Sequence, residues 1–225
     1  MLAVASLWAQ GSPASFFSVD FSSFSMGDPL PSDLAFNYAN DPTFSSVGFF
    51  ANGYWNFALP NSRTFDTWGS PDDCARVSFE AGLTNCFAVQ THLTDYIHEN
   101  ENAAGLVVYL TSWDSENHVI LFGPFRDEGL RIEGPKFGGW NVLGGVIRDV
   151  HLRIEVFGPF YRFFYSVDGM TWIFAGSFNA GNETPLRIGI FSKSWGAAAN
   201  TGASFADFSY EGLAPSTPLP TQDGI

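Results

Sequence analysis

The stretch LRIEVFGPFYRFFYSVDGMTW, residues 152–172, decides the fold class. Apolar and charged side chains alternate along its first half, so an extended chain places Leu152 and Ile154 on one face and Arg153 and Glu155 on the other. A Gly-Pro pair and an Asp-Gly pair divide the rest of the stretch and supply the residue types that tight turns need. The stretch therefore predicts two β-strands joined by a corner, followed by a second turn that leads to a tryptophan.

Similar short segments of period two occupy most of the second half of the chain, and helix signals are nearly absent. They are GLVVYL (105–110), HVILFG (118–123), LRIEG (130–134), TWIFAGS (171–177), LRIGIFS (186–192) and ASFADFSYE (203–211). The Gly-rich KFGGWNVLGG (136–145) reads as a loop. Short strands separated by Gly, Pro, Asn and Asp turns predict an all-β sandwich of two antiparallel sheets.

The domain organisation follows from where this pattern starts and stops. Residues 16–212 are expected to form a single β-sandwich domain, and residues 1–15 the remnant of a signal sequence or a disordered start. Residues 213–225 are rich in Pro and Thr and are predicted to be a linker or tail. Alternation is weaker in the first hundred residues, which leaves open whether they add strands or a separate subdomain.

Composition excludes some partners. The chain of 225 residues contains 24 Phe but only 15% charged residues, and its net charge is −13. Its only lysines are Lys136 and Lys193, so the clustered cations that bind nucleic acid are missing. An anionic membrane surface is disfavoured for the same reason, and no apolar run approaches the roughly 20 residues of a membrane span.

Two cysteines, Cys74 and Cys86, predict one disulfide in an exported protein. A simple hairpin of the strands after each cysteine would hold the two residues on the order of 20 Å apart. A disulfide therefore requires that these strands belong to opposite sheets. Buried thiols are the alternative.

The usual enzymatic motifs do not occur in the sequence, including nucleophile elbows, phosphate loops and Asp-rich calcium loops. Glycoside hydrolysis needs two carboxylates about 5–10 Å apart. Glu99 with Glu101, and Asp114 with Glu116, are close in sequence but lie in predicted loops, where solvation is the simpler explanation for both pairs. The four histidines are scattered without the spacing of metal ligands.

Aromatic and planar polar side chains are the remaining resource, because sugar rings stack on Trp or Tyr and sugar hydroxyls bond to planar groups. Trp113, Trp140 and Trp195 fall in predicted loops, and Arg153, Glu155 and Arg187 are expected on the outer faces of adjacent strands. Closure of the sandwich ends is the structural alternative for each tryptophan. The sequence nominates as carbohydrate-binding candidates Trp113, Trp140, Trp195, Tyr109, Arg153, Glu155, Arg187 and His118.

A set of motifs, in this order along the chain, resembles the concanavalin A-like lectin/glucanase superfamily. The nearest resemblance is to the C-terminal accessory sandwich of β-xylosidases and to uncharacterised "regulation of enolase"-type domains. The matching residues are Gly105, Leu106 and Tyr109, then Leu152 and Arg153, then Phe164, Tyr165, Ser166, Asp168, Gly169 and Trp172, and finally Phe205, Asp207 and Phe208.

The resemblance implies a jelly roll of two curved antiparallel sheets whose concave face binds carbohydrate in many relatives. It implies no required cofactor, although some relatives hold a structural calcium, for which Asp20 and Asp207 are the corresponding residues. The predicted function is a secreted, non-catalytic module that binds a polysaccharide or oligosaccharide, as part of a polysaccharide-degrading system or of a longer chain. The alternatives are a glycoside hydrolase or polysaccharide lyase, and a structural or adhesive extracellular domain.

Overall fold

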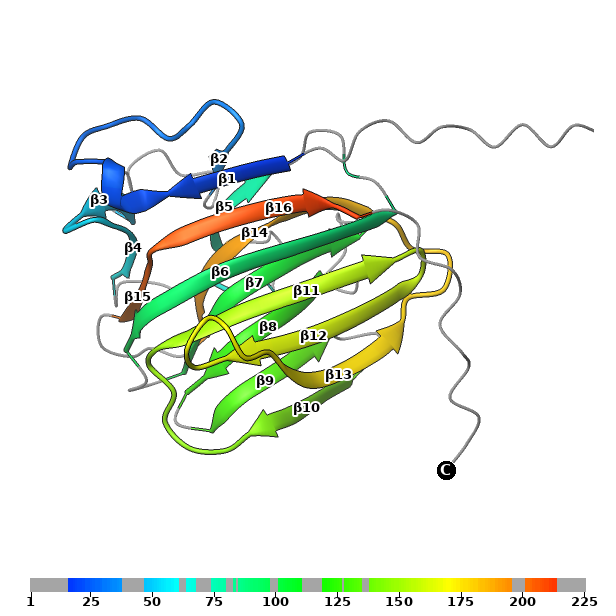
Figure 1. Cartoon of the computed structure of the whole chain (residues 1–225). Helices are drawn as coiled ribbons and strands as arrows, with labels where there is room; N and C mark the ends of the chain where they lie inside the picture. The colour runs from blue at the N-terminus through cyan, green and yellow to red at the C-terminus, as the bar shows by residue number, and fades with distance from the viewer. Residues whose placement is uncertain are drawn as a thin grey trace, which may run out of the picture.

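The computed structural model of the chain describes residues 16–37, 47–60, 64–67, 74–79, 83, 85–97, 101–110, 119–126, 128–134, 138–195 and 201–213. These residues form two antiparallel sheets that pack face to face (Figure 1). No helix in these ranges is long and apolar enough to cross a bilayer. The all-β sandwich predicted from the sequence is confirmed.

One sheet has nine strands, in the order β13-β12-β11-β6-β15-β4-β3, and β16 joins it by pairing with β6 and β1. Its strands are β1 (Phe16–Asp20), β3 (Gly48–Ala51), β4 (Tyr54–Leu59), β6 (Cys86–Tyr96), β11 (Val150–Phe157), β12 (Phe160–Ser166), β13 (Ile173–Asn179), β15 (Thr201–Phe205) and β16 (Asp207–Gly212). A short 3₁₀ helix, η1 (Phe21–Ser23), follows β1.

The other sheet has seven strands, in the order β10-β9-β8-β7-β14-β5-β2. They are β2 (Ala35–Asn37), β5 (Ala75–Phe79), β7 (Asn102–Leu110), β8 (Val119–Phe125), β9 (Gly129–Gly134), β10 (Gly138–Leu143) and β14 (Pro185–Ser194). Strands from the first hundred residues therefore enter both sheets: β2 and β5 join this one, and β1, β3, β4 and β6 join the other.

The main core lies between the sheets, and a second apolar cluster lies on the outer face of the seven-stranded sheet. The core includes Leu106, Phe122 and Ile154, all fully buried. The second cluster contains Val107, Leu121 and Phe191, which are equally buried although they belong to the opposite face of β7, β8 and β14. Both faces of these central strands are therefore shielded from water, whereas β11 and β13 of the nine-stranded sheet keep half-buried or exposed positions.

The hairpin predicted for residues 152–166 forms. Strands β11 and β12 pair from His151 opposite Ser166 to Phe157 opposite Phe160. The following turn is built by Asp168, whose carboxylate accepts hydrogen bonds from the backbone N–H groups of Met170 and Thr171 at 2.8 and 2.7 Å. These bonds hold the pKa of Asp168 well below its usual range.

Two sequence predictions about strands were wrong. The Gly-rich segment predicted as a loop contains β10, which pairs with β9, so Trp140 lies on a strand. The final segment is two strands rather than one: at Ala206 the chain leaves β4 and continues beside β1 as β16. The backbone N–H of Phe21 donates to the Ala206 carbonyl, and the Ala206 N–H donates to the His92 carbonyl, so bonds outside the ladder satisfy the break.

The predicted disulfide is also wrong, because Cys74 and Cys86 are both thiols. The strands that follow them, β5 and β6, do belong to opposite sheets. Cys74, however, belongs to the cluster on the outer side of the seven-stranded sheet, while Cys86 alternates with the core residue Phe87 on the other sheet. The core of roughly 10 Å between two packed sheets exceeds the span of about 7 Å that a disulfide can bridge.

Candidate functional site

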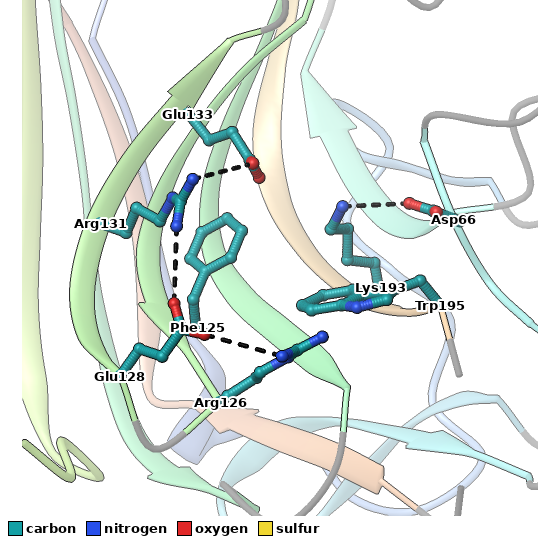
Figure 2. Close-up of a pocket in the computed structure, with 8 residues that line it drawn as sticks. All are labelled: Asp66, Phe125, Arg126, Glu128, Arg131, Glu133, Lys193 and Trp195. Carbon is teal, nitrogen blue, oxygen red and sulfur yellow. Dashed lines mark hydrogen bonds and ion pairs between the residues drawn. The ribbon is translucent and has the colours of Figure 1, made fainter. Parts of the chain in front are cut away.

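A pocket of about 310 Å³ opens on the outer side of the seven-stranded sheet. Figure 2 shows the side chains that line it, which converge from β8, β9 and their connection, from the end of β14, and from the segment 64–67. They are Asp66, Phe125, Arg126, Glu128, Arg131, Glu133, Lys193 and Trp195. The buried Phe125 ring stands between the two walls.

The wall formed by β8 and β9 follows from strand alternation. Leu130 and Ile132 are buried in the core, so Arg131 and Glu133 project to the outer face, in the same pattern that places Arg153 and Glu155 on β11. Arg126 directly follows β8 and has a left-handed conformation, with φ 48°. A non-Gly residue pays about 1–2 kcal/mol for this conformation.

Two hydrogen bonds from the same backbone N–H hold Arg126 in that conformation. Its N–H donates to the Asn102 carbonyl at 3.0 Å and to the Tyr96 hydroxyl at 2.9 Å. Tyr96 is buried, and its own hydroxyl donates to the Asn102 carbonyl at 2.7 Å. The guanidinium of Arg126 is therefore carried into the pocket from a firmly bonded backbone position.

The charged groups of this wall form one continuous chain of ion pairs. Arg126 contacts Glu101 at 2.7 Å and Glu128 at 3.6 Å. Arg131 contacts the same Glu128 at 3.5 Å and Glu133 at 3.6 Å. Negative and positive groups thus alternate from Glu101 to Glu133.

The opposite wall holds a buried cation. Lys193 is only 1% exposed, and its Nζ lies 3.0 Å from the carboxylate of Asp66. Asp66 is brought there by an isolated bridge in which Phe65 and Ser194 exchange backbone hydrogen bonds of 2.9 and 2.8 Å.

Trp195 lies between two cations. The Nζ of Lys193 is 4.7 Å from its ring centroid, and the guanidinium carbon of Arg126 is 5.1 Å from it. Figure 2 shows the two cations on opposite sides of the ring. Cation–π contacts therefore occupy both faces of the indole, which leaves its edge for a ligand.

A glycine makes room for Arg131. A Cβ at Gly139 of β10 would lie 2.9 Å from Nη2 of Arg131, closer than real Cβ contacts allow. The guanidinium thus packs directly against the β10 backbone at Gly139.

The structure separates the candidates predicted from the sequence. Trp195 lines the pocket. Tyr109 is only 1% exposed, in the second apolar cluster, with the guanidinium of Arg76 4.8 Å from its ring centroid. Arg187 pairs opposite Tyr109 on β14, outside the pocket. Trp140 packs edge-on against the core residue Phe163, at 6.4 Å between ring centroids.

Two further candidates, Trp113 and His118, lie outside the described residues, as do Glu99, Asp114 and Glu116. Of the carboxylates considered for hydrolysis, Glu101 begins the chain of ion pairs at the pocket.

The prediction that Arg153 and Glu155 lie on a strand adjacent to that of Arg187 was wrong. They lie on β11 of the nine-stranded sheet, while Arg187 lies on β14 of the other sheet. Glu155 accepts a bond of 3.0 Å from Arg153 and pairs with Arg162 at 2.9 Å. This network occupies the opposite side of the sandwich from the pocket.

Asp20 and Asp207, the residues predicted for calcium, face each other in register on β1 and β16. One carboxylate oxygen of Asp20 accepts the N–H of Ser22, and one of Asp207 accepts the N–H of His92. No group of three or more candidate metal ligands occurs among the described residues. Calcium takes 6–8 oxygen ligands, of which these two carboxylates would supply only a part, and calcium stays a prediction.

Most of the pocket was not nominated by the sequence analysis. A signal for part of it was present, because LRIEG repeats the alternation of LRIEV and projects Arg131 and Glu133 outward. Lys193, one of two lysines in an acidic chain, was another. Asp66 carried no signal, because its place depends on a bridge between segments far apart in sequence.

Solved structures with the same architecture include carbohydrate-active proteins. The GH43 protein BlXynB of Bacillus licheniformis matches with a TM-score of 0.67 and 19% identity, over 87% of this chain and 39% of that one. The catalytic domain of an endo-1,3-β-glucanase (laminarinase) of Thermotoga petrophila matches with a TM-score of 0.58 and 9% identity, over 87% and 96% of the two chains. The exoplasmic/lumenal domain of VIP36 in its Ca²⁺-bound form matches with a TM-score of 0.57 and 8% identity, over 89% and 91%.

The chain has the concanavalin A-like fold. The structural likeness agrees with the superfamily predicted from the sequence motifs, and at these identities it establishes the fold alone. The sequence matches no protein-family model and no curated protein. The match with this chain covers only 39% of the length of the Bacillus licheniformis protein.

Proposed function

We propose that the chain is a secreted, non-catalytic carbohydrate-binding module, and that it binds a glycan in the charged pocket of the seven-stranded sheet. The observation that carries this proposal is the pocket itself, where alternating guanidinium and carboxylate groups line a cavity beside aromatic rings. Sugar hydroxyls both donate and accept hydrogen bonds, so they match a wall on which donors and acceptors alternate.

The neighbours support the same class of ligand. They include a laminarinase catalytic domain, and VIP36 is also known in a Man3GlcNAc-bound form. The likeness to a 39% share of BlXynB supports attachment to a polysaccharide-degrading enzyme, with other domains of a longer chain as partners. The acidic, lysine-poor composition supports export and an uncharged polymer over nucleic acid.

Affinity electrophoresis through gels that contain different soluble polysaccharides tests the proposal. The wild-type chain should be retarded by at least one glycan, and Arg131→Ala should migrate freely, because it removes the guanidinium that pairs with both Glu128 and Glu133. Arg148→Ala is the matched control, since it removes the same charge from an exposed position outside the pocket. A chelator in parallel gels tests calcium.

Each outcome has a distinct meaning. No retardation in any gel would contradict the binding function, and equal retardation of wild type and Arg131→Ala would contradict the pocket as its site. Release of reducing ends by the wild-type chain, abolished by Glu128→Gln, would replace binding by glycan cleavage.

A further inference from the structure

We propose that the pocket selects an uncharged sugar at the end of a glycan and rejects acidic sugars, and that Glu128 and Glu133 impose this choice. The inference rests on the proposed function, because it concerns the ligand of the same pocket. It follows from the balance of charge, from the size of the cavity and from the position of Trp195.

The charged groups at the pocket are already matched to one another. The carboxylates are Asp66, Glu101, Glu128 and Glu133, and the cations are Arg126, Arg131 and Lys193. Every one of these groups makes at least one ion pair, and the set carries one more negative than positive charge.

A charged ligand would disturb this balance. A uronate that approached Arg131 would have to displace Glu128 or Glu133, each within 3.6 Å of that guanidinium. A displaced carboxylate loses a charged partner, and the loss costs most for Glu133, whose side chain is only 23% exposed. The net charge of −13 on the whole chain adds long-range repulsion of polyanions.

A neutral sugar avoids both costs. A hydroxyl can donate to a carboxylate that keeps its ion pair, because each carboxylate has about four lone-pair sites and its arginine partner uses only part of them. The same hydroxyl can accept from a guanidinium N–H. Hydrogen bonding must carry recognition, since cations cover both faces of the Trp195 ring and stacking there is blocked.

The cavity volume limits how much of the glycan enters. Its 310 Å³ lies at the small end of the roughly 300–1,000 Å³ typical of ligand pockets. Lys193, Phe125 and the strands behind them are buried and close the inner end. One or two sugar rings fill such a space, so the pocket receives the end of a chain or a side branch.

Calorimetric titration with pairs of disaccharides tests this selectivity. The two disaccharides of a pair differ only at C6 of their sugar units: glucose is compared with glucuronate, galactose with galacturonate and mannose with mannuronate. We expect at least one neutral sugar to bind, with its acidic partner at least 10-fold weaker. Because only the end of the chain enters the pocket, the hexasaccharide of the neutral sugar should bind within about 3-fold of the disaccharide. That difference corresponds to about 0.65 kcal/mol.

Glu133→Gln keeps the shape of the side chain and removes one negative charge. The affinity for the neutral sugar should then exceed the affinity for its acidic partner by less than about 3-fold. Glu128→Gln is the second variant, in case the first disturbs folding. Glu211→Gln, on an exposed position of β16, is the matched control and should leave the ratio unchanged.

Tight binding of the acidic sugar by the wild-type chain would overturn the inference while leaving the binding function intact. An unchanged ratio in both glutamate variants would also overturn it. If no sugar of either kind binds, the proposed function itself is wrong.

Discussion

The two outer faces of the sandwich carry the same kinds of side chain and use them differently. On the seven-stranded sheet, arginine, glutamate and aromatic groups surround a pocket above a buried apolar cluster. On the nine-stranded sheet, Arg153, Glu155 and Arg162 form a comparable ion-pair trio, but the neighbouring Phe160 and Phe174 are 53% and 58% exposed. One face is a covered surface with a cavity, and the other is open to solvent.

The difference is written in the strands. Strands β7 and β8 are buried at every position, and their sequences are nearly continuous apolar runs. Strand β11 alternates between buried and half-buried positions, as LRIEV alternates between apolar and charged residues. Continuous apolar runs indicate strands covered on both faces, whereas alternation indicates one face toward water. Identical residue types therefore acquire different roles according to what covers the strand beneath them.

The largest difference between the two faces should appear when an aromatic ring is removed from each. Phe191→Ala deletes a fully buried ring of the second cluster and should lower the free energy of unfolding by about 3–5 kcal/mol. Phe174→Ala deletes a ring that is 58% exposed, and should cost less than about 1 kcal/mol. Urea unfolding of both variants measures the contrast, and equal losses would show that both outer faces are equally covered.

Burial should also separate the Lys193–Asp66 pair of the pocket from the ion pairs of the nine-stranded sheet. Loss of one partner from a buried pair costs about 3–5 kcal/mol, and since the Asp66 side chain is 22% exposed we expect about 2–3 kcal/mol for Lys193→Met. Arg162→Met on the open face should cost less than about 1 kcal/mol, because Arg162 contacts water and Glu155 keeps its bond to Arg153. Urea unfolding again provides the measurement. A larger loss in Arg162→Met than in Lys193→Met would reverse the comparison.

The fold could be predicted from the sequence because alternation is a local signal. Strands such as β11, β12 and β14 each carry their own pattern and their own turns. Strand β10 was missed because Gly138 and Gly139 dilute its alternation. In the structure Gly139 lies against the Arg131 guanidinium of the neighbouring strand. The division of β15 from β16 depends on bonds that Ala206 makes with Phe21 and His92, which no local pattern records.

The site was much harder to predict. The sequence places Arg131 and Glu133 on an outer face of the sandwich, but it does not tell which of the two sheets carries them. The separation of Arg187 from Arg153 on different sheets demonstrates this. The pocket joins residues of one hairpin to Asp66 and Lys193, which are far away along the chain. Its existence depends on strand order and register, and these are properties of the assembled sandwich.

Gly139 tests the pocket face with a smaller change. Gly139→Ala places a Cβ against the Arg131 guanidinium and should weaken neutral-sugar binding about 3-fold to 10-fold, or roughly 0.7–1.4 kcal/mol, by shifting that group. Gly144→Ala is the matched control, because no atom lies within 4 Å of a Cβ built there. Calorimetric titration of both variants measures the effect. Equal affinity of the two variants would show that Arg131 adjusts without cost or does not contact the sugar.

The smallest expected effect is the dependence of stability on pH, and it should arise on the outer face of the nine-stranded sheet. His92 and His151 stack there at 3.8 Å between ring centroids, directly opposite each other on β6 and β11. Asp149 contacts His92 at 2.8 Å, and the ring of His151 packs on Gly169 of the Asp168 turn. Among the described residues, no histidine lines the pocket.

Desolvation, and then the charge of His92, lower the pKa of His151 from 6.5. The unfolded chain therefore binds more protons than the folded chain between that lowered pKa and 6.5, so stability should fall as the pH decreases through this window. Burial raises the pKa of Asp207, whose contribution has the opposite sign: it diminishes as the pH rises from about 4 toward the raised value.

Urea midpoints of the wild-type chain and of His151→Gln, measured from pH 7.5 to pH 5, isolate the histidine contribution because Asp207 is common to both. The wild type should lose more stability over this range than His151→Gln, and neutral-sugar affinity should change equally little in both proteins. Parallel pH profiles of stability would mean that His151 binds protons equally well in the folded and unfolded chains. A sugar affinity that followed the histidine would show that the two outer faces are coupled through the core.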